Sequence, residues 1–429
     1  MSPSGTLEKL LSFVKNLVPR RIFQFLQPIY HYKLALMGAL IYRLPSRHIK
    51  VVAITGTKGK TSTAEIVNAI LEEAGYKTAL AGTLRFKIDK EDERNLYKMT
   101  IPGRFFLQKF LHRAVSAKCD WAVIEMTSEG ARQFRHKFID FDGFIFTNLS
   151  PEHIESHGSF ENYKNAKLSI VRALASSPKR PRIVVVNADD SYSPEFLAVD
   201  ADIKTTYSLK DAEPYTLEKD GVVFTFEHIP LHTHLSGTFN LSNILAGIAF
   251  ARAINIAPKV IRHALEKFHG IRGRVERIEM GQDFEVIVDY AHTTDSLEKV
   301  YEVFQGSRKI CILGGTGGGR DSWKRPAMGA VAAAHCNEII LTNEDPYDED
   351  PAKIISEIMT GIEGARAEVI MDRREAIATG LRYARAGDTV IITGKGTDPY
   401  IMGAQGLKTP WDDATVAREE LSKMGFKKN

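Results

Sequence analysis

The stretch VVAITGTKGKTST at residues 51–63 decides the fold of the first half of the chain. A β-branched apolar run leads into a short loop with Gly56, Gly59 and Lys60-Thr61, and residues with helical spacing follow. In such a strand–loop–helix unit the glycines let the backbone approach a polyphosphate, and N–H groups at the helix start face the anion. Lys60 would supply a cation and the Thr61 hydroxyl a ligand for Mg²⁺. The stretch therefore predicts a phosphate-binding loop rather than a plain glycine turn, with a spacing shorter than in GTPases and most kinases.

Length and composition indicate a globular protein of several domains. A chain of 429 residues is too long for one ordinary core, so two or three domains are expected. Residues 1–50 carry eight Lys or Arg and one acid, a formal charge of +7, which leaves −3 for the rest of a chain whose total is +4. The body of the protein therefore gives no support to nucleic-acid binding.

The three cysteines, Cys119, Cys311 and Cys336, lie far apart in the sequence. This spacing suggests neither a disulfide framework nor a zinc site. A reducing cytoplasm is therefore the expected location.

Residues 1–48 form a basic, apolar-rich segment that is expected to be helical. Its longest apolar run, at 34–42, has nine residues, far fewer than the roughly 20 that a membrane-spanning helix needs. No small-residue cleavage site of a signal peptide follows it. Two interpretations stay open: the helices pack on the next domain, or the segment touches an anionic membrane surface peripherally.

From residue 49 onward, apolar strands alternate with helical patterns, which predicts an α/β protein with mainly parallel sheets. The predicted strands are 77–80, 121–125, 143–146 and 182–186, then 286–289, 309–313, 338–342, 368–371 and 389–393. We expect a P-loop-type central domain at 49–270, with a shorter β-rich section at 203–234, and a second, Rossmann-like α/β domain at 271–429.

Polar residues follow several of these strands at the point where each strand ends. Glu125 closes an apolar strand, and its carboxylate could hold Mg²⁺ together with Thr61. The segment 147–158 holds two histidines and two acids within six residues, and Lys167 lies on the helix that follows. Since parallel strands place their carboxyl ends at one edge, these side chains are expected to gather beside the phosphate loop.

The second domain has loops of the same kind. Asp289-Tyr290-Ala291-His292 ends one strand, and the glycine-rich loop 314–321 ends another with Arg320. Gly394-Lys395-Gly396 follows the last strand. A basic pair and a helix-starting proline at 324–326 favour an anion-facing loop.

Together these motifs resemble the Mur ligases, most closely the UDP-N-acetylmuramoyl-tripeptide synthetase branch. The matching motifs, in order, are 55–61 (TGTKGKT), 147–149 (TNL) with His153 and 157–158 (HG), 161–163 (ENY) with 166–167 (AK), 237–240 (GTFN) with Asn243, 273–276 (GRVE), 289–293 (DYAHT), 324–326 (KRP) with 328–329 (MG), and 394–396 (GKG). They cover about residues 50–425.

The resemblance implies ATP-dependent amide bond formation through an acyl phosphate, with ATP and Mg²⁺ as cofactors. The nucleotide-binding residues it implies are Gly56, Thr57, Lys58, Gly59, Lys60, Thr61, Ser62, Asn240 and His292. The metal ligands are Thr61, Glu125, His153 and Lys167, and the catalytic residues are Lys60, His153 and Lys167. The muramoyl-peptide acceptor would contact Thr100, Thr127, Gln133 and Arg135. The implied substrate-binding residues of the second domain are Arg320, Glu344, Asp345, Pro346, Tyr347, Gly394 and Asp398.

Lys167 matches the lysine that this family carries as a carbamate (N6-carboxylysine). Because CO₂ adds only to a neutral amine, the site must depress the pKa of this lysine, and the product is an anion that can ligate Mg²⁺.

The chain departs from the family pattern in three places. Only about 48 residues precede the phosphate loop, where the family usually has a domain that grips the uridine nucleotide. The residues 344–347 read Glu-Asp-Pro-Tyr, where enzymes that add diaminopimelate have Asp-Asn-Pro-Arg. A tyrosine cannot grip a carboxylate bidentately, so diaminopimelate is disfavoured and the nearby acids would suit a bare ammonium, as on lysine. Asp398 stands where the branch has Glu.

Two alternatives to a cell-wall ligase stay open. One is a related ligase of folylpolyglutamate or poly-amino-acid type, and the other is a non-catalytic nucleotide-binding scaffold at the membrane. The expected partners are small molecules, and the chain is expected to be a monomer in the cytoplasm.

Overall fold

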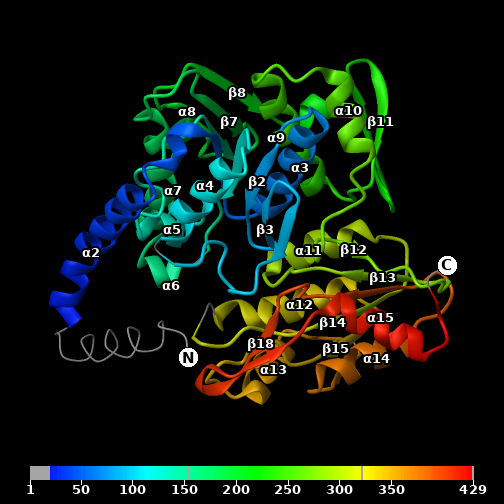
Figure 1. Cartoon of the computed structure of the whole chain (residues 1–429). Coiled ribbons are helices and arrows are strands. Elements are labelled where there is room, and N and C mark those ends of the chain that lie inside the picture. The colour runs from blue at the N-terminus through cyan, green and yellow to red at the C-terminus, as the bar shows by residue number, and fades with distance from the viewer. Residues whose placement is uncertain (1–19, 104, 153, 320–321, 365, 428–429) are drawn as a thin grey trace.

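A computed structural model describes residues 20–103, 105–152, 154–319, 322–364 and 366–427, and for residues 20–26, 154 and 155 it describes the backbone alone. Two of the predicted site residues, His153 and Arg320, lie outside the described residues. The predicted α/β class is confirmed: two parallel-rich sheets, each with its own helices, follow one another along the chain. Figure 1 shows the first of them in blue to green above the second in yellow to red.

The first sheet has eight strands in the order β4-β3-β2-β5-β1-β6-β7-β8. They are β1 (Lys50–Thr55), β2 (Thr78–Ala81), β3 (Arg85–Ile88), β4 (Glu91–Arg94), β5 (Trp121–Glu125), β6 (Gly143–Phe146), β7 (Ile183–Asn187) and β8 (Ile203–Tyr207). At one edge β3 pairs antiparallel with both β2 and β4, and all other neighbouring strands are parallel. The sheet therefore brings the ends of β5, β1 and β6 side by side.

Helices cover both faces of this sheet. They are α3 (Lys60–Glu73), α4 (Phe106–Ser116), α5 (Ser128–Arg132), α6 (Ile154–His157), α7 (Phe160–Ala175), α8 (Ser193–Leu197), α9 (Thr238–Ala253) and α10 (Pro258–Glu266). On β1, Val52 and Ile54 join the core beneath α3 and α9, while Val51 and Ala53 join the core beneath α4 and α7. Burial on both faces explains why this strand is an unbroken apolar run.

A small antiparallel sheet ends this half of the chain. It consists of β9 (Tyr215–Glu218), β10 (Gly221–Phe226) and β11 (Ile229–Thr233), and its apolar side joins the core around α9.

The second large sheet has six strands in the order β12-β13-β17-β14-β15-β16, and only β12 is antiparallel. The strands are β12 (Glu276–Arg277), β13 (Glu285–Val288), β14 (Lys309–Leu313), β15 (Glu338–Leu341), β16 (Ala367–Val369) and β17 (Thr389–Ile392), and the hairpin β18 (Tyr400–Met402) and β19 (Lys408–Pro410) follows. The helices are α11 (Thr294–Val303), α12 (Arg325–His335), α13 (Pro351–Met359), α14 (Arg373–Tyr383) and α15 (Asp413–Lys423).

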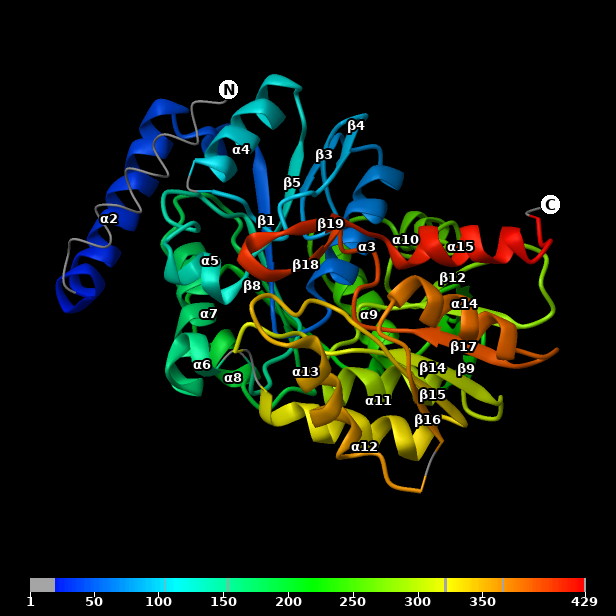
Figure 2. The ribbon, with the colours of Figure 1, turned by 90° about the horizontal axis from the view of Figure 1, so that it is seen from below.

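Helix α2 (Arg20–Ile41) runs along one flank of the first half in both ribbon views (Figures 1 and 2). It buries Ala35 and Ala39, and its Gly38 lies against Phe105, where a Cβ atom would come within 2.8 Å of the ring. Within the described part of the chain, no helix has the length and apolar run needed to cross a membrane.

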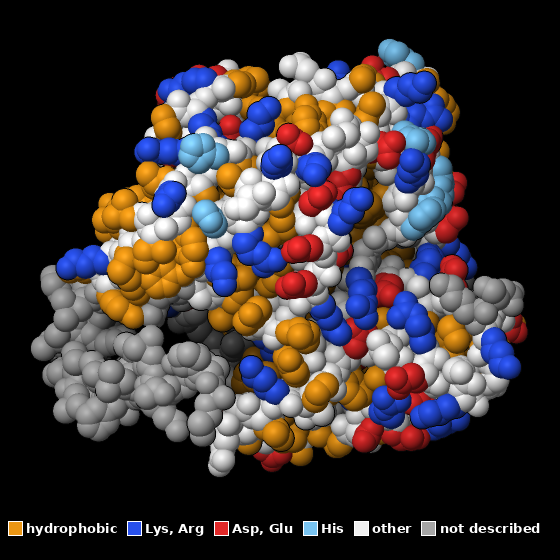
Figure 3. Space-filling model, viewed as in Figure 1, with side chains coloured by type: hydrophobic (Ala, Val, Ile, Leu, Met, Phe, Trp, Pro, Cys, Tyr) orange, Lys and Arg blue, Asp and Glu red, His pale blue; other side chains and the backbone are white. Residues whose placement is uncertain are grey.

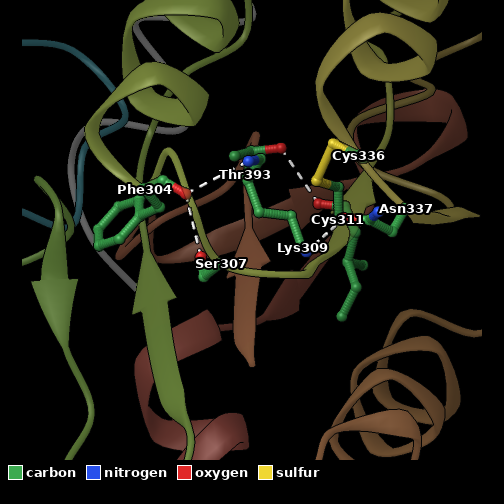
Figure 4. The surroundings of a disulfide bond; sticks show 8 residues. Phe304, Ser307, Lys309, Cys311, Cys336, Asn337 and Thr393 are labelled. Carbon is green, nitrogen blue, oxygen red and sulfur yellow. Dashed lines mark hydrogen bonds between the residues drawn. A yellow bond between two sulfur atoms is a disulfide. The ribbon is translucent and has the colours of Figure 1, made fainter. Parts of the chain in front are cut away.

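The sequence-based expectation for the cysteines was wrong, because Cys311 and Cys336 form a disulfide (Figure 4). Cys311 lies in β14 and Cys336 directly follows α12, and their Cα atoms are 6.0 Å apart. A strand, a loop and a returning helix bring two residues together that are 25 apart in sequence, so sequence distance is no guide to spatial distance here. The remaining cysteine, Cys119, is free and buried.

Candidate active site

The loop between β1 and α3 requires glycine at two positions. Gly59, before the first turn of α3, has φ +81°, and a Cβ atom there would lie 2.3 Å from Asn243 Oδ1. A Cβ atom on Gly56 would lie 1.9 Å from Thr147 Oγ1. The two glycines thus let the loop fold tightly between α9 and the segment that follows β6.

That segment fixes the loop by hydrogen bonds. Thr57 N donates to Asn148 O at 2.8 Å, and Lys58 N donates to Asn148 Oδ1 at 2.9 Å. Ser150 N donates to Thr57 Oγ1 at 3.0 Å, and the same hydroxyl meets the Tyr163 hydroxyl at 3.0 Å. The residues after β6 therefore lie beside the phosphate loop, as the sequence predicts.

Two lysines converge on the loop. Lys60 Nζ donates to Gly56 O at 3.0 Å and to Thr57 O at 2.8 Å, and Lys167 Nζ, from α7, donates to the same Gly56 O at 2.5 Å. Lys167 is buried, and its Nζ lies 4.7 Å from the centroid of the Tyr163 ring. Burial, followed by the charge of Lys60, holds the pKa of Lys167 well below its usual value. The pKa of Lys60 is also lowered, chiefly by burial, although Glu125 opposes this.

Glu125, at the end of β5, is hydrogen-bonded to the loop threonine, Thr61. Its Oε2 accepts a hydrogen bond from Thr61 Oγ1 at 3.1 Å, and both of its oxygens accept from Thr83, at 2.8 Å from the amide and 3.0 Å from the hydroxyl. The side chain is fully buried, and burial raises its pKa. A buried carboxylate beside a hydroxyl at the start of a helix is a donor set that suits Mg²⁺. Ser62, the next residue of α3, is buried as well.

The predicted acceptor residues form a chain of contacts away from Glu125. The Thr83 hydroxyl meets the Thr100 hydroxyl at 2.9 Å, and Arg135 donates to the carbonyl of Ile101. Arg135 also donates to Gln133 Oε1 at 2.7 Å. Thr127 is not part of this chain of contacts. Its hydroxyl accepts a hydrogen bond from Gly130 N at 3.1 Å and caps the N-terminus of α5.

The two residues expected near the nucleotide differ in position. Asn240 is buried on α9, donates to Ser236 O at 2.9 Å and meets Asn243, so it lies behind the phosphate loop. His292 follows β13, and the next residue, Thr293, accepts a hydrogen bond from Lys58 of the phosphate loop at 2.9 Å. Its pKa is lowered by burial and then by Lys324, although Glu152 opposes this.

Three cations of the first half, Lys58, Arg94 and Lys98, form four ion pairs with carboxylates of the second half around this site. Lys58 Nζ lies 2.6 Å from Asp295 Oδ2, and Arg94 lies 2.7 Å from Asp412 Oδ2. Lys98 Nζ lies 2.5 Å from Asp345 Oδ2 and 3.0 Å from Asp398 Oδ2. In each pair the first half supplies the cation and the second half supplies the carboxylate.

The loops that end β15 and β17 carry the remaining predicted residues. Glu344 Oε1 accepts from Thr316 at 2.7 Å, whereas its buried Oε2 has no hydrogen-bond partner among the described residues and lies beside Gly394. Asp345 and Asp398 both accept from Lys395 Nζ at 2.9 Å. Gly317 packs against the Pro346 carbonyl, and Tyr347 N donates to Met402 O at 3.0 Å. These residues therefore form one cluster, apart from Arg320, which lies outside the described residues.

Sequence reasoning missed Thr83 and Lys98. Thr83 directly follows Gly82, whose lack of a side chain leaves room for Glu125 Oε1. A threonine just after a parallel strand could have been predicted from the sequence as a site residue. Lys98 lies in an irregular loop and meets acids about 250 and 300 residues further along the chain, for which the sequence offers no local signal.

Comparison with known proteins agrees with the motifs. The chain matches the family model described as Mur ligase middle domain over residues 54–251, and the one described as Mur ligase, glutamate ligase domain, over residues 273–396. It is 37% identical to UDP-N-acetylmuramoyl-L-alanyl-D-glutamate–2,6-diaminopimelate ligase of Syntrophomonas wolfei, covering 90% of this chain and 81% of the relative. It is 36% identical to UDP-N-acetylmuramyl-tripeptide synthetase of a Roseiflexus species, covering 92% and 82%.

Solved structures show the same relationship. A structure of UDP-N-acetylmuramoyl-L-alanyl-D-glutamate–2,6-diaminopimelate ligase superposes with a TM-score of 0.61 at 28% identity, covering 88% of this chain and 79% of that one. Folylpolyglutamate synthase of Mycobacterium tuberculosis superposes with a TM-score of 0.69, covering 91% and 94%, but at 14% identity this likeness shows the fold alone. On the evidence of its two matched domains, its ordered motifs and its relatives, the chain belongs to the Mur ligase family, whose members use ATP and Mg²⁺.

Proposed function

We propose that this protein is an ATP-dependent, ADP-forming ligase that adds an amino acid to the peptide of a muramoyl-peptide precursor. The observation that supports this most is the meeting of Lys60, Lys167, Thr61 and Glu125 around one short loop. A scaffold that had lost ligation would not need to keep these contacts. The relatives named as muramoyl-peptide ligases share 36–37% identity, whereas the folylpolyglutamate synthase shares 14%.

The reaction has two steps. A carboxylate oxygen of the acceptor attacks the γ-phosphorus of ATP, ADP leaves, and an acyl phosphate forms. The amine of the amino acid then attacks the acyl carbon, phosphate leaves, and the amine loses a proton. Such a reaction needs positioned substrates and neutralised charge more than a protein nucleophile.

The residues of the first half fit the nucleotide part of this reaction. We assign the phosphates to residues 56–62 and Mg²⁺ to Thr61 and Glu125, with His153 as a further metal ligand. Asn240 would support the loop from behind, and His292 would approach the nucleotide from the second half. Bound Mg²⁺ would neutralise phosphate charge.

Lys167 is proposed to act as its carbamate. The buried ammonium shares the Gly56 carbonyl with Lys60, and the lowered pKa favours the neutral amine that CO₂ requires. The carbamate would carry a negative charge beside the Lys60 ammonium.

The two other substrates would each contact a different half of the protein. We place the acceptor along Thr100, Thr127, Gln133 and Arg135, and the amino acid at the cluster of the second half, with Arg320 contributing. The cluster residues are Glu344, Asp345, Pro346, Tyr347, Gly394 and Asp398.

A phosphate-release assay tests this function. Purified protein with ATP and Mg²⁺ is given UDP-N-acetylmuramoyl-L-alanyl-D-glutamate together with each of a panel of amino acids. Phosphate release that requires both the acceptor and one amino acid supports the proposal. Release with a folate acceptor instead, or with none, contradicts it.

Helix α2 supports a second proposal, peripheral contact with an anionic membrane surface. It exposes Leu36, Met37, Leu40 and Ile41, and Figure 3 shows hydrophobic side chains gathered over this flank. Residues 1–48 contain one acid, Glu8. An apolar face flanked by basic residues suits an acidic lipid headgroup layer. Co-sedimentation with phosphatidylglycerol vesicles but not with phosphatidylcholine vesicles is expected, and Leu40→Glu should abolish it.

We further propose a monomer in the cytoplasm. Both halves of the site come from one chain, and the reaction consumes ATP. Sedimentation velocity checks the monomer, and localisation of a tagged protein checks the compartment. Because Cys311 and Cys336 form a disulfide, the cysteines do not support a reducing compartment, and the proposed location follows from the use of ATP alone.

A further inference from the structure

The small antiparallel sheet of the first half carries metal-ligating side chains that the proposed function does not use. In β11, Leu231 and Thr233 are buried, so the alternating His232 and His234 lie on the outer face of the sheet. The register of β9, β10 and β11 puts Glu218, at the end of β9, on this same face. Figure 3 shows histidine side chains gathered along the edge where Figure 1 places β11.

Three of these side chains have the spacing of ligands around one ion. His232 Nε2 lies 3.7 Å from Glu218 Oε2 and 3.9 Å from Asp220 Oδ1, and one ligand atom of each residue lies within 4.8 Å of the others. Both distances are too long for hydrogen bonds. Donor atoms bound at about 2.1 Å from one metal ion lie about 3–4 Å from one another. The separations therefore match coordination by a shared ion better than direct pairing.

The turn that carries the two acids is fixed in place. The carbonyl of Lys219, between them, accepts a hydrogen bond from Ser236 Oγ at 2.7 Å and another from Arg277. A Cβ atom on Gly221, the next residue after the turn, would lie 3.1 Å from His232 Nε2, so the glycine leaves room for the imidazole. The backbone thus holds the carboxylates and the ring beside one another before any ion arrives.

His234 adds a further donor beside this group. Its ring centroid lies 5.1 Å from that of His232 and 4.8 Å from that of His269. His234 also donates a hydrogen bond to the backbone carbonyl of Glu266. A metal-ligating histidine usually donates its second ring nitrogen to such a carbonyl, which fixes the ring and leaves the other nitrogen for the metal.

We propose that Glu218, Asp220 and His232, with His234 beside them, bind one divalent transition-metal ion such as Zn²⁺. A mixed set of imidazole and carboxylate donors suits Zn²⁺, Ni²⁺ or Cu²⁺, whereas Mg²⁺ and Ca²⁺ prefer oxygen ligands alone. The ion would offset the repulsion between two carboxylates that are two residues apart. It would join the β9–β10 turn to β11 and stabilise the small sheet, and it needs no part of the ligation reaction.

Calorimetric titration of the untagged protein with ZnCl₂, in buffer that contains Mg²⁺, tests the site. We expect saturable binding of Zn²⁺ in the wild type, and His232→Gln and Glu218→Gln should each weaken it by at least about 10- to 100-fold. The matched control is His228→Asn, in the exposed β10–β11 turn at φ +65°, a conformation that asparagine tolerates. His228→Asn should leave the binding unchanged, and so should Glu125→Gln, which alters the proposed Mg²⁺ site.

Thermal unfolding gives a second readout. Zn²⁺ should raise the Tm of the wild type and of His228→Asn more than that of His232→Gln, because only an intact site stabilises the folded state on binding. No saturable Zn²⁺ binding in the wild type, or the same affinity in both His232→Gln and Glu218→Gln as in the wild type, would overturn the inference. Loss of the binding in Glu125→Gln alone would place the ion at the proposed active site and overturn it as well.

Discussion

Lys60 and Lys167 donate to one and the same acceptor, the carbonyl oxygen of Gly56, at 3.0 Å and 2.5 Å. One lysine comes from the loop itself and the other from α7, more than 100 residues later. Two ammonium groups at one carbonyl oxygen repel each other, and burial adds to the cost of the charge on Lys167. Lys167 therefore gives up its proton more readily than an exposed lysine does.

Lys167→Ala is expected to abolish ligation, because the proposed carbamate cannot form. A small carboxylate such as acetate should partly restore activity by occupying the space of the missing anion. Phosphate release with and without acetate measures this. Lys164→Ala, on the same helix and paired with Glu195, is the control and should stay active. Undiminished turnover in Lys167→Ala would remove this lysine from the site.

Lys167→Met is expected to stabilise the protein in CO₂-free buffer. The pKa of Lys167 is lowered in the folded state, so the unfolded state binds a proton that the folded state lacks, and folding loses stability as the pH falls below the usual lysine pKa. The gain in Tm should therefore be largest at neutral pH and shrink toward pH 10, at about 2–4 °C for each kcal/mol. Calorimetry across this pH range checks it, and a gain that grows with pH would contradict the argument.

Glu125→Gln is expected to raise the Mg²⁺ concentration needed for half-maximal activity by about 10- to 100-fold. The amide keeps the shape of the side chain but removes the charge that would bind the metal. Because burial raises the pKa of Glu125, the wild type should lose Mg²⁺ binding at a higher pH than an ordinary glutamate would, as the pH falls through that pKa. Mg²⁺ titrations at several pH values measure both effects. An unchanged titration in Glu125→Gln would place the metal elsewhere.

Arg373→Met is expected to destabilise the second half by about 3–5 kcal/mol. Arg373 makes two hydrogen bonds to buried Asp413, at 2.8 and 2.7 Å, and also donates to Thr393 O at 2.7 Å. The substitution leaves the Asp413 carboxylate buried without its cation. Urea unfolding followed by Trp411 fluorescence measures the loss, since the Trp411 indole donates to Asp413. The neighbouring Arg374→Met breaks pairs with Glu419 and Glu420 at a partly exposed position and leaves Glu420 paired with Lys423, so it should cost less than about 1 kcal/mol.

Much of the fold could be predicted because its strands are apolar runs buried on both faces. The same pattern identified Glu125 and the residues after Phe146 as neighbours of the loop, since parallel strands end at one edge. β4 was missed because its sequence, Glu-Asp-Glu-Arg, is fully exposed at the sheet edge and has no apolar alternation. The sites of Lys98 and of the Cys311–Cys336 bond were missed because both depend on the path of the chain between distant residues.

The bond between Cys311 and Cys336 makes one half of the protein responsive to laboratory reductants. It closes a loop of 25 residues across β14 and α12, and closing such a loop typically contributes about 2–4 kcal/mol. In the first half, Cys119 is a buried free thiol, so a reductant breaks no bond there. Dithiothreitol should therefore destabilise the second half of the protein and leave the first half unchanged. Melting curves recorded with and without dithiothreitol should differ only in the unfolding transition of the second half.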